Sequence, residues 1–568
     1  MLDITLATHF VPGTNVKGDA AGASWSFMLP SLELRQVVCL GLPREETLMA
    51  LARFADKVLV FCGGQRELQR SRHMRERREL GNVSVAARQD DRLPLADGAT
   101  DLVLVCQRGF VRRLERDADE QAEIRRVLAD SGSLYVEGWS PRGDLGSARL
   151  NGDLGSTLAQ ELFLMTPRLG EAGTAVPVED RRTLEYFASH KLECRSFQRR
   201  PLKQASALID GWAPAGRLGR RTCLLASGAE ADLAGSPPRY VREIARAGGV
   251  DIDAYRWGLS APGRYTSRKV VLFLFAPGSD MPEYVVKLTR TGEMNYRLEN
   301  ECRALELLAE IDGIDTSVVP RAVFSGHHAG LAVVGESAID GVPLLSRTDG
   351  SPTCKLGGAA ISWLHDLGAR TADPDSASPR TVADGLARLL ERFVEIYRPA
   401  AGHRAFLESQ IVRIATADGP FPLVFQHGDP GVWNVMATGD DTVAFLDWEA
   451  AEPHGMPLWD LFYFLRSYCM RSVSVRGKRA RLDALSRLLL ADSPLSALLT
   501  ESTRRYAAGI GLPGELVEPL FYTCWMHRAL KEATRLVPSK LSTGHYYQLL
   551  LLAIERHDEQ ALQRLFST

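Results

Sequence analysis

The sequence predicts two folded regions of different class: a doubly wound α/β domain, followed by an α+β domain built from two lobes. Apolar, strand-like runs alternate with helical segments up to residue 225. Residues 226–238 are small and flexible and end in two prolines, as expected of a linker. From residue 239 onward, a few strand-like runs precede a long helical stretch. The length of 568 residues fits this division, because a single hydrophobic core does not grow to that size.

Residues 1–225 carry the pattern of a parallel sheet covered by helices on both faces, which is a Rossmann-like arrangement. Short apolar runs have the length of buried strands, and helical segments separate most of them. The runs are 36–40, 57–61, 83–86, 101–105 and 133–136, and the helical segments are 45–55, 66–79 and 119–128.

The second region predicts a small sheet followed by a large helical lobe. We expect the smaller lobe at residues 239–340, with strands at 270–275 and 284–288 and an amphipathic helix over 295–311. Residues 341–568 form the larger lobe, in which most segments have a helical pattern. Its expected helices include 358–365, 382–397, 404–415 and most of 458–566.

Composition narrows the class of protein. Hydrophobic residues make up 45% and charged residues 24% of the chain, which is ordinary for a soluble globular protein. The formal net charge of -2 leaves no basic excess, so no nucleic-acid partner is expected. Nine irregularly spaced cysteines, without a C-x-x-C pair, suggest neither a disulfide framework nor a zinc site. The start lacks a signal-peptide pattern and no apolar stretch approaches roughly 20 residues, so we expect a cytoplasmic protein without a membrane span. The oligomeric state stays open.

The strongest chemical signal lies within residues 425–460. A short apolar run is followed by His427 and Asp429, with Asn434 five residues beyond Asp429. A second apolar run, after a Gly-Asp-Asp turn, is followed by Asp447. A strand–loop–strand unit of this kind can bring a general base, an amide ligand and a carboxylate ligand to one point. Metal-assisted phosphoryl transfer requires this set of groups.

Each of these four residues has an expected role. Asp429 is the candidate base, because a carboxylate there can orient a substrate hydroxyl and accept its proton as the new P–O bond forms. Asn434 and Asp447 supply oxygen ligands, which hard Mg²⁺ prefers. His427 is expected to complete the catalytic loop by bracing it through its ring nitrogens. Single His and Asp residues are common in solvent loops, but H-G-D-x-x-x-x-N followed by a strand ending in D-W-E is far rarer.

A lysine and a glutamate upstream form a candidate phosphate-holding pair. Lys287 ends the run Tyr-Val-Val-Lys, on the strand face opposite Val286 and Leu288. In the helix over 295–311, Glu301 falls on the apolar stripe, where a carboxylate needs a partner. Lys287 is the natural partner, and the pair would hold the lysine against nucleotide phosphates. The alternative is that Glu301 lies at the edge of the stripe and reaches solvent.

Two further segments complete the expected nucleotide site. The turn 259–269 precedes the first strand of the smaller lobe, and Ser260 and Gly263 within it could offer donors to phosphate. The turn has a single glycine and no G-x-G-x-x-G, so an ordinary β-turn is a close alternative. Glu336 and Ala338 follow the strand-like run that ends the smaller lobe. At such a crossing between lobes, backbone groups can bind the edge of an adenine.

Together these motifs resemble those of the aminoglycoside phosphotransferase and choline kinase family, over residues 240–560. The matching residues are Lys287, Glu301, His427-Gly428-Asp429, Asn434 and Asp447-Trp448-Glu449, with a helix ending in Ile361–His365 and a later Asp460 as supporting cues. The phosphate turn departs from the family pattern. The resemblance implies a bilobal protein-kinase-like fold, ATP with Mg²⁺ as donor, and a small-molecule hydroxyl as acceptor. It does not fix the acceptor, because relatives act on aminoglycosides, other antibiotics, amino alcohols, sugars and peptide hydroxyls.

Residues 30–140 resemble a class I S-adenosylmethionine-dependent methyltransferase in layout. The phrases that carry this resemblance are Val37–Gly41, Leu93–Val103 and Glu123–Glu137. The first phrase departs from the family, because Leu-Pro-Arg-Glu follows Gly41 where further glycines would let the backbone approach the cofactor. The second strand runs into Cys62 and not into an acid for the ribose hydroxyls. We therefore expect a methyltransferase-like domain without catalysis, and the sequence leaves open whether it binds S-adenosylmethionine.

Three hypotheses about function remain open. The first is a phosphotransferase that uses ATP and Mg²⁺, in which the N-terminal domain binds or presents the acceptor or mediates assembly. The second is a bifunctional enzyme that phosphorylates and methylates one acceptor, as a tailoring or capping step. The third is a pseudokinase-type binding module, against which the intact base and metal ligands argue. The sequence does not separate antibiotic resistance from biosynthesis.

Overall fold

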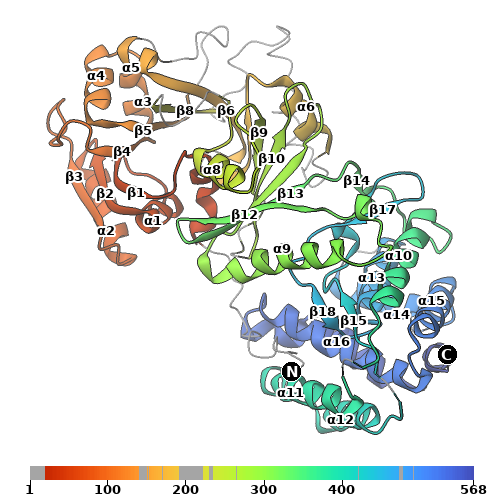
Figure 1. Cartoon of the computed structure of the whole chain (residues 1–568). Helices are drawn as coiled ribbons and strands as arrows, with labels where there is room; N and C mark the ends of the chain where they lie inside the picture. The colour runs from red at the N-terminus through yellow and green to blue at the C-terminus, as the bar shows by residue number, and fades with distance from the viewer. Residues whose placement is uncertain are drawn as a thin grey trace. The chain divides into compact units, whose positions relative to one another are not determined.

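The computed structural model of the chain (Figure 1) describes residues 19–139, 150, 152–168, 171–190, 222–228 and 235–567, apart from 262, 264, 266, 376, 420, 473–476 and 490. The described chain separates into two compact units. The first, called the sheet unit below, contains Lys17–Leu298 and Ala322–Ala338. The second, called the helical unit, contains Glu299–Arg321 and Ile339–Thr568. These units are defined by compactness, so the domain boundaries predicted at 225, 238 and 340 stay predictions.

The sheet unit begins with a parallel sheet. Its strands are β1 Leu34–Leu40, β2 Ala55–Cys62, β3 Val83–Ala87, β4 Thr100–Val105 and β5 Leu128–Glu137. They lie in the order β3-β2-β1-β4-β5, and every neighbouring pair is parallel. The central strand β1 places Val37 beside Val58 of β2 and Leu102 of β4. The doubly wound α/β fold predicted for this region is confirmed.

Helices cover both faces of this sheet, because both faces of its strands are apolar. The helices are the 3-10 helix η2 Asp19–Met28, α1 Glu45–Phe54, α2 Gln65–Arg77, α3 Arg108–Leu114, α4 Ala118–Val127, α5 Gly152–Thr157 and α6 Arg181–His190. Val37 and Cys39 of β1 belong to one buried cluster, together with the buried leucines of α1. Val38 and Leu40 belong to the other cluster, together with buried residues of α3 and α4.

The sheet does not end at β5 but continues through eight antiparallel strands, so that it has thirteen strands in the described residues. The added strands are β6 Leu158–Arg168, β7 Glu171–Pro177, β8 Thr222–Gly228, β9 Arg256–Ser260, β10 Val270–Phe275, β11 Tyr284–Leu288, β12 Ala322–His328 and β13 Leu331–Ser337. Their order after β5 is β8-β6-β7-β9-β10-β11-β13-β12. Strands of the N-terminal domain and of the predicted smaller lobe therefore form one sheet.

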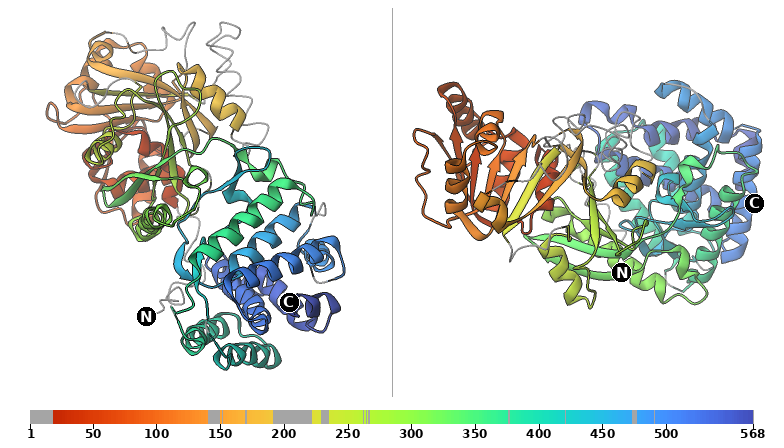
Figure 2. Two further views of the ribbon diagram at one scale, coloured as in Figure 1. Left: turned by 45° about the vertical axis from the view of Figure 1, so that its right-hand side comes forward. Right: turned by 90° about the horizontal axis from the view of Figure 1, so that it is seen from above.

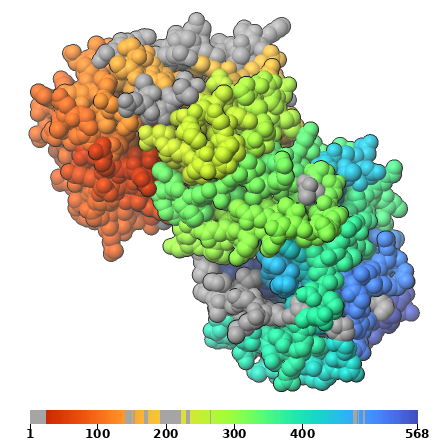
Figure 3. Space-filling view, in the orientation of Figure 1, coloured from red at the N-terminus to blue at the C-terminus, as the bar shows by residue number. Residues whose placement is uncertain are grey.

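The pairing of β7 with β9 joins these two regions. Thr174 lies opposite Ser260, and the N–H of Ala261 donates to the carbonyl of Gly173 at 2.7 Å. Helix α8, Arg239–Ala247, adds a second contact, since the hydroxyl of Tyr240 donates to a backbone carbonyl of η2 at 3.0 Å. Figure 3 shows this packing at the surface, where the yellow-green atoms lie against those coloured orange to red.

The first three residues of the predicted linker 226–238 lie in a strand. Residues 226–228 belong to β8, which is buried along its whole length between β5 and β6. Pro238 directly precedes α8, and residues 229–234 lie outside the described residues. The small residues 226–228 form a strand because they pair with β5 on one side and β6 on the other. Composition alone does not reveal this pairing.

Strand β11 has the alternation predicted for it. Val286 and Leu288 are fully buried, and Lys287 lies on the other face, between Val271 of β10 and Val334 of β13. Helix α9, Asn295–Ala309, follows, and Glu301 within it is fully buried, as its place on the apolar stripe predicted.

The helical unit consists mainly of helices, with short strand pairs that carry the polar motif (Figure 2). The helices are α10 Lys355–Thr371, α11 Pro379–Tyr397, α12 Ala401–Ala415, α13 Trp459–Cys469, α14 Lys478–Leu489, α15 Pro494–Ile510, α16 Val517–Ala533, α17 His545–Glu555 and α18 Gln560–Phe566. The strands are β14 Val342–Pro343, β15 Val424–Gln426, β16 Val435–Ala437, β17 Val443–Phe445 and β18 Glu452–Gly455. The predicted α+β kinase-like fold is confirmed. No helix among the described residues has the length and apolar character needed to span a membrane.

Candidate active site

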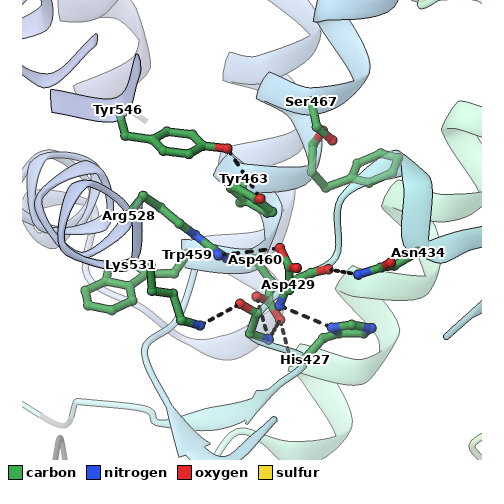
Figure 4. Close-up of polar contacts among 12 residues, drawn as sticks. His427, Asp429, Asn434, Trp459, Asp460, Tyr463, Ser467, Arg528, Lys531 and Tyr546 are labelled. Atoms are coloured by element: carbon green, nitrogen blue, oxygen red, sulfur yellow. Dashed lines mark hydrogen bonds and ion pairs between the residues drawn. The ribbon is translucent and has the colours of Figure 1, made fainter. Parts of the chain in front are cut away.

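The segment after β15 forms a tight loop whose backbone is held by a buried carboxylate (Figure 4). The N–H groups of His427 and Gly428 donate to Asp460, at 2.5 and 3.1 Å. Asp460 lies in the first turn of α13 and is 9% exposed. Burial raises the pKa of the Asp460 carboxyl, although His427, Arg528 and the two N–H donors oppose this shift. The position of the loop therefore depends on one side chain of α13.

His427 connects the start of this loop to the strand that leads to Asp447. The N–H of Asp429 donates to its Nδ1 at 3.2 Å, so Nε2 carries the proton and donates to the carbonyl of Leu446 at 3.1 Å. Burial lowers the pKa of His427, although Asp460 and other nearby carboxylates oppose the shift. The ring is thus neutral, with both nitrogens engaged, which is the geometry of a brace and not of a proton shuttle.

Asp429 is the carboxylate that this loop leaves accessible. Its side chain is 31% exposed, and its Oδ1 lies 3.7 Å from Nη1 of Arg528. The side-chain amide of Asn434 donates to the backbone carbonyl of Asp429 at 2.9 Å and closes the loop. A partly exposed carboxylate on a loop held from both ends can accept a proton from a bound hydroxyl.

Asn434 and Asp447 lie at the same end of the hairpin formed by β16 and β17. Asn434 directly precedes β16, and the N–H of Leu446, just after β17, donates to the carbonyl of Asn434 at 2.8 Å. Asp447 has a φ of 69°, which is uncommon for a residue other than glycine and typical of functional sites.

These two residues fit an Mg²⁺ ion, because both end in oxygen donors and lie on adjoining positions of the hairpin. Among the described residues, no group of three or more His, Cys, Asp or Glu side chains could hold a metal ion. Mg²⁺ usually keeps several waters and binds substrate phosphates beside one or two protein carboxylates, so a site of two residues is sufficient for it.

The segment after Asp447 is fixed by the part of α9 that belongs to the helical unit. The N–H of Trp448 donates to Oε1 of Glu301 at 3.0 Å, and the side-chain amide of Asn300 donates to the carbonyl of Ala451 at 2.9 Å. The buried carboxylate of Glu301 therefore has a backbone partner in the D-W-E motif, which the sequence analysis did not foresee.

Lys287 has a partner in the sheet unit that the sequence did not suggest. Its Nζ lies 2.8 Å from Oε2 of Glu336, and the two side chains are 11% and 3% exposed. The pair of Lys287 with Glu301 would join the two units and stays a prediction. The N–H of Ala338 donates to the carbonyl of Glu283 at 2.8 Å, so this N–H is engaged and Ala338 offers its carbonyl. Binding of adenine near Glu336 and Ala338 also stays a prediction.

The turn predicted to cover the phosphates begins at the end of β9 and is held by an arginine. Ser260 is buried in the strand, and Gly263 has a φ of 80° in an exposed position. Arg290, just after β11, donates to the carbonyls of Ala261 and Arg268, at 3.0 and 2.8 Å. Burial, with a smaller contribution from Arg268, lowers the pKa of Arg290 to about 10. This buried guanidinium fixes both ends of a turn that lacks a glycine-rich sequence.

Two basic residues of α16 contact the loop from His427 to Asn434 and were not predicted as site residues. Arg528 is 3% exposed and packs over the ring of Tyr463, 3.4 Å from its centroid. Nζ of Lys531 donates to the carbonyl of Gly428 at 3.1 Å. Helical periodicity could have found Arg528, because a charged residue falls on the apolar stripe of α16 just as Glu301 does in α9.

The cofactor cleft of a doubly wound domain lies at the carboxyl ends of its strands, and here residues of the chain bind to one another at that edge. The two carboxylate oxygens of Glu67 accept the N–H groups of Leu42 and Gly63, at 2.6 and 2.8 Å. A Cβ atom on Gly41 would collide with that of Gln107, so the segments after β1 and β4 touch. These contacts occupy the N–H groups of Leu42 and Gly63, which would otherwise be free to face a bound nucleoside. The residues present therefore do not fit S-adenosylmethionine.

Comparison with known sequences identifies the second region. Residues 266–490 match the sequence model of a family described as a phosphotransferase enzyme family. The match covers less than half of the chain but includes Lys287 and the whole motif from His427 to Asp460. The resemblance to phosphotransferases is therefore confirmed for this segment. No curated protein sequence matches the chain.

Solved structures similar to the chain include both kinds of protein that its sequence resembles. Aminoglycoside phosphotransferase APH(3'')-Id from Streptomyces rimosus is 18% identical, with 52% of this chain and 98% of that one covered and a TM-score of 0.31. A SAM-dependent methyltransferase from Aquifex aeolicus is 16% identical, with 25% and 76% covered and a TM-score of 0.18. WbdD, solved with a kinase inhibitor, is 14% identical, with 90% and 96% covered and a TM-score of 0.22.

Proposed function

We propose that this protein is a phosphotransferase that moves the γ-phosphoryl group of ATP to a hydroxyl of a small molecule, with Mg²⁺. The observation that carries the proposal is the loop from His427 to Asn434. Its backbone is bound to Asp460, and it presents Asp429 beside the hairpin end that holds Asn434 and Asp447. The family match over residues 266–490 supports phosphoryl transfer as the class of reaction.

In this reaction Asp429 orients the acceptor hydroxyl and accepts its proton. The hydroxyl oxygen forms a bond to the γ-phosphorus as the bond from that phosphorus to the ADP oxygen breaks. Asn434 and Asp447 would hold Mg²⁺, which when bound neutralises charge on the phosphates. His427 keeps the loop in shape, since its neutral ring bonds to both sides of it.

The nucleotide-holding residues come from the sheet unit. Lys287 is the proposed contact to the phosphates, and Glu336 fixes its ammonium group at 2.8 Å. Ser260 and Gly263 lie in the turn proposed to cover the phosphates, which Arg290 holds by its carbonyls. The N-terminal domain is proposed to support these strands through the shared sheet and not to catalyse methyl transfer, because Glu67 already accepts the N–H groups of Leu42 and Gly63.

The test is release of ADP from ATP and Mg²⁺ in the presence of a library of hydroxyl compounds. The Asp429→Asn variant should lose about 10²- to 10⁴-fold in rate, the usual contribution of a general base, and should still bind ATP. Asp440→Asn is a matched control, because Asp440 is a fully exposed carboxylate in the turn of the same hairpin.

The outcomes separate the hypotheses. Unchanged transfer by Asp429→Asn would show that the base is assigned wrongly. Binding of ATP without turnover across the library would point to a binding module. Transfer of a methyl group to the same acceptor, or binding of S-adenosylmethionine by the full chain, would establish the bifunctional enzyme.

A further inference from the structure

Two basic side chains of α16, Arg528 and Lys531, contact the loop that carries Asp429 (Figure 4). Nη1 of Arg528 lies 3.7 Å from Oδ1 of Asp429, and Lys531, three residues further along α16, donates to the loop carbonyl of Gly428. An acceptor hydroxyl that reaches Asp429 from the side of α16 therefore meets these two cations.

Arg528 is buried in a way that stability alone does not explain. Its side chain is 4% exposed, and its Nε and Nη2 have no hydrogen-bond partner among the residues that the structure describes. Its guanidinium is covered on one face by the ring of Tyr463. A buried charge with incomplete hydrogen bonding is costly, and such groups are retained where function requires them. The remaining nitrogen, Nη1, faces Asp429 and has its carboxylate as a charged partner.

The acidic groups near Arg528 are already engaged. Asp460 accepts the N–H groups of the loop, and Glu532 of α16 accepts the N–H of Tyr546 at 2.9 Å. Burial raises the pKa of Glu452 to about 7, although Lys531 opposes the shift, so this carboxyl is partly neutral near pH 7. Among the described residues, Asp460 and Glu532 thus already accept hydrogen bonds, and Glu452 carries less than a full negative charge near pH 7.

We propose that Arg528 is the acceptor-side cation of this site: it positions the carboxylate of Asp429 and selects hydroxyl compounds that carry an anionic group near the reacting hydroxyl. This rests on the proposed phosphotransferase function and narrows its acceptor class. Guanidinium groups favour carboxylate and phosphate, and local potentials of one sign concentrate ligands of the other. A polycationic acceptor would be repelled by Arg528 and Lys531.

The test uses three hexoses that differ at one carbon: glucose, glucuronate and 6-amino-6-deoxyglucose. Each is scored as an acceptor by ADP release, or, where it is not phosphorylated, as an inhibitor of the background hydrolysis of ATP by water. Both readouts give an apparent affinity. Glucuronate should bind about tenfold to a hundredfold more tightly than the amino sugar, the range expected for one hydrogen bond to a charged group.

Variants separate charge from structure. Arg528→Gln should abolish the preference for the anion, whereas Arg528→Lys should keep the preference but lower kcat, because an ammonium group cannot hold Asp429 as the guanidinium does. Arg413→Gln is the matched control, since Arg413 binds Glu518 at the other end of α16 at 2.6 Å, and it should change neither.

Three results would overturn the inference: tighter binding of the amino sugar, equal affinity for all three hexoses, or an anion preference that survives in Arg528→Gln. These results leave the proposed function intact if ADP release still depends on Asp429. If no ATP is consumed under any condition, the proposed function fails, and the inference fails with it.

Discussion

Gly428 occupies a backbone conformation and a space that exclude any side chain. Its φ is 77°, and a Cβ atom there would collide with the carbonyl oxygen of Ala450. Gly428→Ala should therefore lower the free energy of unfolding by about 1–3 kcal/mol and displace Asp429, with loss of activity. Urea denaturation and ADP release would measure the two effects.

A glycine-to-alanine substitution outside the loop shows whether the losses of stability and activity are specific to Gly428. Gly358 lies on an exposed position of α10, where an added Cβ atom would point into open space. Gly358→Ala should raise stability by about 0.5–1 kcal/mol, because alanine is the better helix former. Equal effects of the two substitutions would contradict the account of the loop.

His365, at the end of the predicted ISWLH segment, should make the fold sensitive to acid. Burial, with Arg505 nearby, lowers its pKa to about 4, whereas an unfolded histidine titrates near about 6.5. Between these values the unfolded chain binds a proton that the folded chain does not. The stability is therefore full above the unfolded pKa and is lost as the pH falls toward 4.

Replacing His365 with phenylalanine tests whether this histidine lowers the stability of the fold as the pH falls. The substitution keeps an aromatic ring against Tyr506, whose centroid lies 5.6 Å away. The free energy of unfolding of His365→Phe, relative to the natural chain, should rise as the pH is lowered from 7 to 5, measured by urea denaturation. A difference that is the same at both values would exclude His365 as the source of acid sensitivity.

At the scale of single residues, the sequence predicted those site residues that lie close together along the chain. His427, Asp429, Asn434 and Asp447 are close together because one loop and one hairpin carry them, and a motif of that length is visible in the sequence. Arg528 was missed because it reaches the loop from about a hundred residues downstream, through the packing of α16. Helical periodicity could have marked Arg528 as a buried charge, but it could not have revealed that its partner is Asp429.

At the scale of elements, no pattern in the sequence predicted the pairing of β7 with β9. Strands β6 and β7 contain proline and glycine, and their register shifts near Pro167, which weakens the strand signal in the sequence. The parallel strands β1 to β5, by contrast, are continuous apolar runs and were predicted within a few residues. Long apolar runs are visible in a sequence, whereas antiparallel partners far apart are not.

This pairing predicts that the kinase-like region cannot be separated cleanly from the N-terminal domain. Deleting residues 1–238 removes β7 and leaves the edge of β9 exposed, with its unpaired backbone groups and buried Leu259 uncovered. The fragment 239–568 should aggregate or unfold at a lower urea concentration than the full chain. Light scattering and denaturation would show this, and a monomeric fragment as stable as the full chain would mean that the junction contributes little.

For the whole molecule, the consequence is that one sheet links the methyltransferase-like strands to the strands that we propose to hold the nucleotide. The order of strands runs without a break from β3 to β12, and Lys287 lies on β11 within it. A ligand that binds only the folded state stabilises it by about 2.7 kcal/mol at a hundred times its Kd. Because strands of one sheet tend to open together, this stabilisation should extend beyond the strands that touch the ligand.

Hydrogen exchange tests this coupling on the full chain. With a non-hydrolysable ATP analogue and Mg²⁺, the amides of β1 and β4 should exchange up to about a hundredfold more slowly, although both strands belong to the methyltransferase-like region. S-adenosylmethionine should leave the same amides unchanged, because Glu67 already occupies the N–H groups of Leu42 and Gly63. Protection confined to β9–β13 would show that the stabilisation by the nucleotide does not extend to β1 and β4, although all these strands belong to one sheet. Protection by S-adenosylmethionine would reopen the cofactor cleft as a binding site and restore the bifunctional enzyme as the better hypothesis.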